Sequence, residues 1–541
     1  MNEYPLIHAA LDALMDAWNR SDAPGGVLAI SHRGKLLACR AVGLANLETG
    51  AALQAGSQFP IGSITKQFTC AALLLLEADG VLSLDDLVGR WLPELPPVQQ
   101  APSLRQLMTH TGGVRCFLDQ WMFDGYRTMP VGTPWAAQRR QRTANFPPGE
   151  GSSYCNGGYL LLTQVVERAS GQTLGRFLHE RLFAPLGMFA TSLPGPDNPL
   201  EAGSVNTYMR ASAAVPPSGW QPALAMTEDR FGDGGIVSTA ADLLRWASFL
   251  RHSNGPVRLE CMAPSSRAKG GSGYGFGLIG QQWRGLRLIQ HAGGLPGANS
   301  ALLTLPDQEL DIVVLFNRSA SAIDMALRAA EIVLREQLPP ASQLPSASGH
   351  AHLLGHYLAP ETGLLFGFSD VDGMLSLSLF GDTPFPLEER ASQGLELPFG
   401  ADVGTGDIRF RMHAQSIAGA PVKALDYFDG VRWYRAERVE MMPCSVKDFV
   451  AGVPRTFRCE DVAASLDFED NAGELVVRIR GEHGNGRYRA DMLSPDLIRF
   501  RSSQFPSSKL ARLIREDSQV VAVVVSTGRT RATIFTCQEV P

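Results

Sequence analysis

The sequence has few features that would direct the chain to a membrane or to nucleic acid. Its longest apolar runs, such as Ala71–Leu76, are far shorter than the roughly 20 residues of a membrane-spanning helix. Lysine and arginine together number 48 against 54 acidic residues, a net charge of −6, so the basic excess typical of nucleic-acid binding is absent. The N-terminus lacks the basic start and the continuous apolar segment of a secretory signal. We therefore expect a cytoplasmic protein without a nucleic-acid or membrane partner.

Cysteine is also sparse. The eight cysteines are scattered along the chain, and no two of them form a C-x-x-C pair. This pattern predicts neither a zinc site nor a disulfide framework. A reduced, cytoplasmic compartment is the simplest interpretation, and we expect no metal or other cofactor.

The length and the hydrophobic pattern predict several domains. A chain of 541 residues is too long for one ordinary core, so two or three domains are expected. Residues 1–337 mix helical and strand patterns, and strands at both ends of this part indicate an α+β fold whose terminal segments share one sheet. Its expected elements are a hairpin at 25–43, helices at 64–79 and 156–170, antiparallel strands at 286–294 and 300–317, and a helix at about 320–336.

The last third of the chain contains an internal repeat. A segment rich in proline and serine at 338–349 is typical of a linker. Beyond it, residues 357–381 match residues 457–481 without a gap at aromatic, acidic and glycine positions. Alternation with a period of two predicts strands on either side of each turn. We expect two copies of a small antiparallel β-barrel domain, at 350–443 and 446–541.

The pattern with the most chemical content is Ser63-Ile-Thr-Lys66 at the start of a predicted helix. Residues three apart on a helix share one face, so the lysine lies beside the serine hydroxyl. A serine nucleophile needs such a neighbour to take its proton, and a helix N-terminus supplies N–H groups for developing negative charge. A second match, Ser266-Arg-Ala-Lys269, has no apolar helix behind it and is interpreted as a loop.

Two further elements follow in the sequence, a Y-x-N element at 154–156 and an H-x-G element at 291–293. A tyrosine can carry a proton and an asparagine amide can donate to a substrate carbonyl, while small residues on a strand leave room for a substrate backbone. Taken alone, each element has a plainer interpretation: a core tyrosine with a helix-capping asparagine, and a structural histidine.

Together the three elements resemble those of the penicillin-recognising serine hydrolases, in which the third element is K-T-G or H-x-G. The motifs GGVLAI, FPIGSITKQFTCA, FPPGEGSSYCNGGY, FGDGGIVSTAADLLRW and YGFGL…HAGG are most similar to those of the D-aminopeptidases. The resemblance covers residues 20–335. The C-terminal extension adds to it, since D-aminopeptidases of this family carry two C-terminal β-barrels.

The resemblance implies a β-lactamase/transpeptidase-like catalytic domain and a catalytic role for four side chains, Ser63, Lys66, Tyr154 and His291. Ser63 would be the acylated nucleophile, and Lys66 and Tyr154 would be the two proton carriers, either of which could be the base. The mechanism would be acylation, release of the amine and attack by water, with no metal.

His291 and three further positions would serve the substrate and the transition state. His291 would take the strand position of the K-T-G lysine and orient Tyr154, and Asn156 would hold the substrate amide. Gly293 and Gly294 would let the substrate backbone lie along the strand, with the main-chain N–H of Gly294 in the oxyanion hole. Residues near these motifs are interpreted as structural: Glu150 and Asp233 as turn residues, Cys155 as a small filler, and His110 at the start of a loop.

In D-aminopeptidases a loop of the last barrel reaches the active site, and an acid on it contributes to binding the substrate ammonium. Its counterpart is expected at 481–492, which offers the acids Glu482 and Asp491, with Asn485 and Arg487 between them. An arginine near the position of that acid would repel an ammonium and favour a carboxylate, whereas Glu482 could still bind the ammonium. A solvated hairpin tip is the alternative interpretation of this segment.

Three functional hypotheses follow. The leading one is a serine hydrolase that releases an N-terminal D-residue from small peptides or amides, a D-stereospecific aminopeptidase or amidase. The second is an esterase, β-lactamase-like hydrolase or D-peptidase with another acceptor, such as a carboxylate-bearing substrate. The third is a catalytically silent penicillin-recognising protein that senses a cell-wall peptide. A homodimer is expected from family analogy alone.

Overall fold

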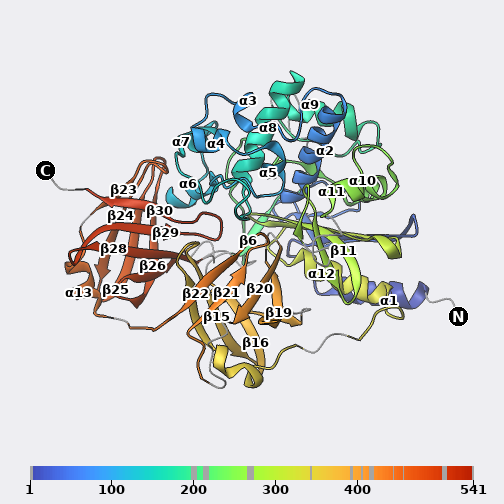
Figure 1. Cartoon of the computed structure of the whole chain (residues 1–541). Coiled ribbons are helices and arrows are strands. Elements are labelled where there is room, and N and C mark those ends of the chain that lie inside the picture. The colour runs from blue at the N-terminus through green and yellow to red at the C-terminus, as the bar shows by residue number, and fades with distance from the viewer. Residues whose placement is uncertain are drawn as a thin grey trace. The chain divides into compact units, whose positions relative to one another are not determined.

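The computed structural model divides the chain into two units, and each is considered by itself (Figure 1). Unit 1 comprises residues 1–94, 103–109 and 158–341, and unit 2 comprises residues 95–102, 110–157 and 342–541. The segments 95–102 and 110–157, which fall within the predicted catalytic domain, therefore group with the C-terminal part of the chain. The described residues are 4–195, 204–210, 219–264, 273–340, 344–389, 394–403, 406–412, 420–442, 444–454, 456–502 and 508–538.

Unit 1 is built on an antiparallel sheet, whose seven described strands have the order β2-β1-β13-β12-β11-β10-β9. Strand β1 pairs with β13 along its length, with Gly26 opposite Phe316. The first and last strands of this unit are therefore neighbours, which confirms the predicted α+β arrangement. The strands are β1 (Gly26–His32), β2 (Lys35–Val42), β9 (Gly273–Tyr274), β10 (Ile279–Trp283), β11 (Leu286–Leu295), β12 (Ala298–Leu305) and β13 (Leu310–Phe316).

Helices cover this sheet and complete the core of unit 1. Helices α1 (Tyr4–Asp16) and α12 (Ala322–Val333) share one apolar cluster with the central strands, because the residues on one face of each helix are apolar. Helices α2 (Thr65–Ala78) and α10 (Ala240–His252) pack against each other through Phe68 and Trp246, whose ring centroids lie 4.4 Å apart. Both α2 and α8 (Asn156–Ser170) end within one residue of the predicted bounds.

Shorter elements connect these helices and strands. The helical ones are η1 (Gly62–Ile64), α3 (Val88–Trp91), α5 (Leu104–Met108), α9 (Leu174–Leu178), η2 (His179–Phe183), α11 (Leu259–Met262) and η4 (Pro306–Gln308). The short strands are β3 (Leu44–Asn46), β4 (Ala51–Ala52), β5 (Phe59–Pro60), β6 (Tyr208–Arg210), β7 (Trp220–Pro222) and β8 (Val237–Ser238).

Unit 2 holds two antiparallel β structures. The first is a half-barrel sheet of nine described strands in the order β17-β16-β15-β14-β22-β21-β20-β19-β18. The second is a closed barrel of eight strands, β23 to β30, in which β23 pairs with β30 (red in Figure 1). The prediction of two C-terminal barrels thus holds in full for the second copy, whereas the first forms a half-barrel.

The strands of the half-barrel are β14 (Gly355–Ala359), β15 (Leu364–Val371), β16 (Met374–Leu379), β17 (Phe385–Pro386), β18 (Glu388–Glu389), β19 (Glu396–Val403), β20 (Gly406–Met412), β21 (Ala424–Phe428) and β22 (Trp433–Val439). Those of the barrel are β23 (Phe457–Cys459), β24 (Ala464–Asn471), β25 (Glu474–Arg480), β26 (Asn485–Ser494), β27 (Leu497–Arg501), β28 (Ser508–Glu516), β29 (Gln519–Ser526) and β30 (Thr533–Cys537). The helical elements of unit 2 are α4 (Pro97–Gln100), α6 (Leu118–Phe123), α7 (Thr133–Arg140), η5 (Ser348–Leu353) and α13 (Val446–Ala451).

The predicted offset of 100 residues is visible in the structure of the repeat. Strands β15 and β24 begin at residues 364 and 464, and β16 and β25 begin at 374 and 474. The turns between them are also alike. The Asp370 carboxylate accepts a hydrogen bond from Gly373 N at 2.8 Å, and the Asp470 carboxylate accepts one from Gly473 N at 2.7 Å. Both glycines have positive φ, which glycine adopts at little cost.

The segment 481–492 is a strand for most of its length. Only residues 481–484 form a turn, and β26 begins at Asn485. Along β26 exposed residues such as Arg487 alternate with buried ones such as Tyr488, as on a strand with one face in a barrel core. The prediction of a loop throughout 481–492 is therefore wrong.

Two other predictions concern a loop at the second S-x-x-K match and the absence of a membrane-spanning segment. The second S-x-x-K match, Ser266–Lys269, lies outside the described residues. In the part of the chain that the structure describes, no helix is both long and apolar enough to cross a membrane.

Candidate active site

Ser63 lies on the single helical turn η1, immediately before α2. Lys66 is buried in the first turn of α2, and its Nζ lies 3.0 Å from Ser63 Oγ. The same Nζ donates to the main-chain carbonyl of Asp233 at 2.5 Å and lies 5.3 Å from the ring centroid of Tyr159. The side-chain nitrogen of Lys66 is therefore held against the serine hydroxyl, as the three-residue spacing predicts.

The main chain before Ser63 is fixed by strands β11 and β12. Ser300 Oγ donates to Ile61 O at 2.7 Å. A Cβ on Gly293 would lie only 2.0 Å from Ile61 O, so the close approach of β11 to this turn requires glycine there. Gly62 itself has a φ of +52°, and a Cβ on it would lie 2.9 Å from Gly294 N. These glycines set the position of the serine turn against the H-x-G strand.

The start of α2 is held by the FGDGG segment, which sequence analysis treats as a turn. Thr69 Oγ1 donates to Gly232 O at 2.7 Å, and Ile236 N donates to Thr65 Oγ1 at 3.1 Å. The segment thus anchors the helix on two sides of Lys66. Asp233 acts through its main-chain carbonyl, so the interpretation of its side chain as a turn residue is compatible with a contact to Lys66.

His291 lies within β11, which continues through Gly293 and Gly294 to Leu295. The histidine therefore lies inside the strand, and β11 matches the predicted strand at 286–294 to within one residue. Its Nδ1 lies 2.7 Å from Ala292 O, and its Nε2 lies 2.9 Å from the hydroxyl of Tyr274. A carbonyl only accepts, so the proton is on Nδ1, and Nε2 accepts from the tyrosine.

The electrostatic environment keeps His291 neutral. Burial, with a further contribution from the charge of Lys66, lowers the pKa of His291 to about 3, against the opposing effect of Ala292 O. The imidazole therefore offers hydrogen bonds without a charge at neutral pH. Tyr274, the first residue of the YGFGL motif, has no role predicted from the sequence, and its hydroxyl fixes the orientation of this ring.

Tyr154 and Asn156 belong to unit 2. Asn156 is buried and opens helix α8, and Tyr154 is half-buried two residues earlier. The ring of Tyr154 lies 4.3 Å from that of His110, and His110 Nδ1 accepts a hydrogen bond from Cys155 N at 3.1 Å. The histidine therefore braces the middle of the Y-x-N element, a role that its place in the sequence does not reveal.

The turn at 481–484 contacts the segment that carries Tyr154 at two points, residues 124 and 140, both earlier in the chain than Tyr154. His483 N donates to Asp124 Oδ1 at 3.0 Å, and Glu482 pairs with Arg140 at 2.8 Å. On β26, Arg487 Nη2 lies 3.4 Å from the Glu469 carboxylate. Both Glu482 and Arg487, the predicted substrate-binding charges, are therefore paired within unit 2.

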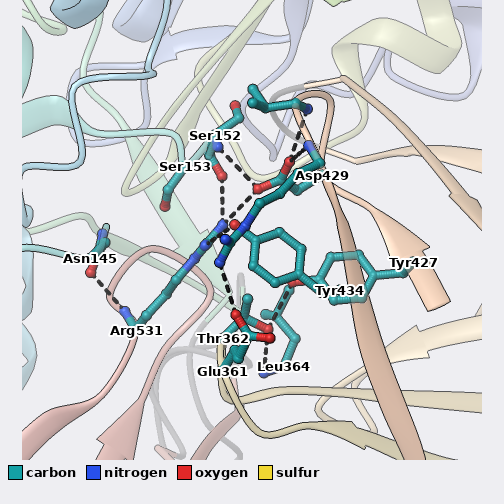
Figure 2. Close-up of polar contacts among 12 residues, drawn as sticks. Asn145, Ser152, Ser153, Glu361, Thr362, Leu364, Tyr427, Asp429, Tyr434 and Arg531 are labelled. Atoms are coloured by element: carbon teal, nitrogen blue, oxygen red, sulfur yellow. Dashed lines mark hydrogen bonds and ion pairs between the residues drawn. The ribbon is translucent and has the colours of Figure 1, made fainter. Parts of the chain in front are cut away.

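A different turn of the barrel lies next to the Y-x-N element. Residues 527–532 join β29 to β30, and the guanidinium of Arg529 lies 5.8 Å from the ring centroid of Tyr154. Ser153 Oγ donates to Arg529 O at 3.0 Å. Figure 2 shows the neighbouring Arg531 surrounded by polar groups of this region.

The predicted site residues thus fall into two groups. Ser63, Lys66, His291, Gly293 and Gly294 are brought together in unit 1, and Tyr154, Asn156, Glu482, Asn485 and Arg487 lie in unit 2. Among the described residues no three His, Cys, Asp or Glu side chains are grouped so that they could hold a metal ion.

A sheet with paired first and last strands, a serine with a lysine on the following helix, and a glycine-rich strand beside them define a hydrolase of the β-lactamase and penicillin-binding class. The family model described as Beta-lactamase matches residues 7–337, and the chain belongs to this family.

Comparison with known proteins shows which members of this family the chain is similar to. A D-aminopeptidase of Cereibacter sphaeroides is 31% identical over 387 residues, which cover 68% of this chain and 70% of the relative. A D-aminopeptidase of Brucella ovis is 29% identical over 396 residues, 71% of this chain and 72% of the relative. The octameric penicillin-binding protein homologue from Pyrococcus abyssi matches 99% of this chain and 100% of its own with a TM-score of 0.54 and 17% identity, which shows a shared fold.

Proposed function

We propose that the chain is a serine hydrolase that forms an acyl-enzyme on Ser63 and releases an N-terminal D-residue from small peptides or amides. The observation that carries this proposal is the distance of 3.0 Å between Lys66 Nζ and Ser63 Oγ. The similarity to two D-aminopeptidases supports the substrate class.

In the proposed acylation, Ser63 Oγ attacks the substrate carbonyl carbon and gives its proton to the base, which is either Lys66 as a neutral amine or Tyr154 as a phenolate. The carbonyl oxygen becomes an oxyanion, which accepts from the main-chain N–H groups of Ser63 and Gly294. The carbon–nitrogen bond then breaks, and the amine leaves with the proton. In deacylation, water attacks the ester, the same groups accept the water's proton, and Ser63 Oγ recovers a proton as the acid leaves.

The remaining predicted residues position the substrate in this proposal. Asn156 donates its amide to the substrate carbonyl or side chain. The neutral ring of His291, whose nitrogens bond Ala292 O and the Tyr274 hydroxyl, forms part of the site on the β11 side, and Gly293 leaves room beside β11 for Ile61 O. This close approach of the main chain sets the position of the Ser63 turn beside the strand on which the substrate would lie.

Binding of the substrate ammonium needs an acidic group, and Glu482 is the predicted one. Glu482 could bind an ammonium, but its carboxylate is paired with Arg140 at 2.8 Å. A second candidate, a hydrolase for carboxylate-bearing substrates, is favoured by Arg529. This exposed guanidinium lies beside Tyr154, and within the described residues it has no ion-pair partner, unlike Arg487.

Other activities of the same chemistry, an esterase or a β-lactamase-like hydrolase, would use the same acyl-enzyme. A silent peptide sensor is the further alternative. The retention of Ser63, Lys66, Tyr154 and His291 argues against it, because a binding protein needs no proton carriers next to a serine.

The test is hydrolysis of D-alanine p-nitroanilide, compared with its N-acetyl and L forms. Cleavage of the free-amine D form alone, lost in Ser63→Ala and kept in Ser266→Ala, is the expected result. Preference for a blocked or carboxylate-bearing form would favour the second candidate. Peptide binding without turnover of anilides, esters or β-lactams would favour the sensor.

Two properties remain expectations that rest on sequence and family analogy, a cytoplasmic location and a homodimer. Cell fractionation and light scattering of the purified chain test them directly.

A further inference from the structure

The turn that joins β29 to β30 is braced from within. Thr527 N donates to Thr530 O at 2.9 Å, and Thr530 N donates to Thr527 Oγ1 at 2.9 Å. Arg531, which follows, is only 8% exposed although it is an arginine. A buried guanidinium must have its N–H groups satisfied, so its partners show what the turn is built to hold.

Three partners surround the guanidinium of Arg531 (Figure 2). Nη1 donates to the hydroxyl of Tyr434 at 2.7 Å. Nη2 donates to the carbonyl of Ser152 at 2.9 Å and to Oδ2 of Asp429 at 3.0 Å. Tyr434 and Asp429 belong to the half-barrel region, whereas Ser152 lies two residues before Tyr154.

The Asp429 carboxylate binds Ser152 as well as Arg531. Its Oδ2 also accepts a hydrogen bond from Ser152 N at 3.0 Å, and its Oδ1 accepts from Val431 N and Arg432 N at 2.9 and 3.0 Å. Both the N–H and the C=O of Ser152 are therefore bound by side chains of one buried ion pair. Because the main chain makes both contacts, the position of residue 152 is fixed whatever its side chain.

The main chain of the turn contributes further contacts to the same segment. Asn145 Oδ1 accepts from Arg531 N at 2.9 Å, and Asn145 Nδ2 donates to Arg529 O at 3.0 Å. The hydroxyl of Ser153 donates to the same carbonyl of Arg529 at 3.0 Å. The segment that precedes Tyr154 is thus held in place at residues 145, 152 and 153.

We propose that Arg531, acting with Asp429, is a positioning residue that fixes the main chain ahead of Tyr154 and so aims its phenol for proton transfer. The inference rests on the proposed function, in which Tyr154 carries a proton to or from Ser63. In this inference both C-terminal β structures contribute to catalysis, because the half-barrel supplies Asp429 and the closed barrel supplies Arg531.

A double-mutant cycle with Tyr154→Phe tests this. The substitution Arg531→Met keeps an unbranched side chain but removes every donor. We expect it to lower kcat on D-alanine p-nitroanilide by about 10- to 100-fold, as a misplacement of about 1 Å does, with KM changed less than about threefold. In the Tyr154→Phe background the same substitution should change kcat less than about twofold. Equal factors in both backgrounds would overturn the inference, because a general structural effect does not depend on the phenol.

Arg438→Met is the matched control. Arg438 Nη1 donates to the Tyr357 hydroxyl at 2.8 Å and to Val422 O at 3.2 Å, and among the described residues it contacts none of 110–157. It should keep kcat within about twofold of the wild type. A loss as large as that of Arg531→Met would overturn the inference. If Arg531→Met does not fold, Arg531→Lys, which cannot reach all three partners, replaces it in the same cycle.

The wild type and Tyr154→Phe separate this inference from the proposed function. If the wild type cleaves the anilide and Tyr154→Phe is impaired, unchanged turnover in Arg531→Met overturns the inference alone. If Tyr154→Phe is as active as the wild type, the catalytic role of Tyr154 fails and the inference with it. If the wild type does not cleave the anilide, the rate of labelling of Ser63 by a fluorophosphonate replaces kcat in the cycle. Slower labelling in Arg531→Met than in Arg438→Met then supports the inference, and equal rates overturn it.

Discussion

His110 Nδ1 accepts a hydrogen bond from the main-chain N–H of Cys155 at 3.1 Å, and the His110 ring lies 4.3 Å from that of Tyr154. The histidine is 2% exposed and has a φ of +60°, so its position is set by the fold around it. The imidazole supports the Y-x-N element from one side while the Arg531 turn holds the residues before it.

The first prediction concerns this support. His110→Ala should lower kcat by roughly 10-fold or more, because it frees the main chain between Tyr154 and Asn156. His110→Asn, whose side-chain oxygen can accept from Cys155 N, should recover part of the loss. Steady-state kinetics with circular dichroism as a check on folding measures both. Equal activity of His110→Ala and the wild type would contradict this role.

The second prediction compares two neighbouring glycines of β11. A Cβ at residue 293 would lie 2.0 Å from Ile61 O, whereas one at residue 294 would have its nearest neighbour, Asn299 Nδ2, at 3.6 Å. Gly293→Ala should therefore destabilise the fold by about 1–3 kcal/mol and displace the Ser63 turn. Gly294→Ala should cost less than about 1 kcal/mol. Urea unfolding of the two variants gives the comparison, and equal stability losses would show that the approach of Ile61 to β11 is not as close as described.

Much of this fold could be predicted from local patterns in the sequence. Helix α2 occupies residues 65–78 where apolar spacing predicts 64–79, and the repeat offset of 100 residues recurs in β15 and β24. Such features depend on residues near one another in the chain. A local pattern also predicts β26, where a loop was expected. Its residues alternate between polar and apolar, as in a strand, but the glycines around them favoured the prediction of a loop; these residues are Arg487, Tyr488, Arg489 and Ala490.

Contacts between distant residues were not predictable in the same way. Arg531 meets Ser152 across 379 residues, and Asp429 meets it across 277. Both bind main-chain atoms of Ser152, so no residue type at that position signals the contact. Likewise, Tyr274 binds the ring of His291, and His110 binds the main-chain N–H of Cys155. No spacing rule in the sequence connects the members of either pair.

The third prediction concerns pH and stability. Burial and Lys66 lower the pKa of His291 to about 3, well below the ordinary value of 6.5. The unfolded chain then binds a proton at this residue below about pH 6.5 that the folded chain does not bind. The contribution of His291 to stability is therefore present above pH 6.5 and is lost progressively as the pH falls towards 3.

His291→Gln removes this titration. Between pH 7 and pH 5 the wild type should lose on the order of 2 kcal/mol more stability than the variant, as a shift of this size implies. Denaturant unfolding at the two pH values measures the difference, in which other titrating groups cancel. The same loss in both proteins would mean that His291 is protonated in the folded chain, contrary to its burial.

The last prediction decides which arginine affects substrate charge. Arg529 is exposed beside Tyr154 without an ion-pair partner among the described residues, whereas Arg487 lies 3.4 Å from the Glu469 carboxylate. Arg529→Ala should raise kcat/KM for D-alanine p-nitroanilide relative to its N-succinyl derivative by about fivefold, the effect of roughly 1 kcal/mol from one charge near a surface. Arg487→Ala is the matched control and should leave the ratio unchanged. A ratio that moves with Arg487 and not with Arg529 would return the selectivity to β26, and a ratio that moves with neither would show that both guanidinium groups are too far from the substrate to select its charge.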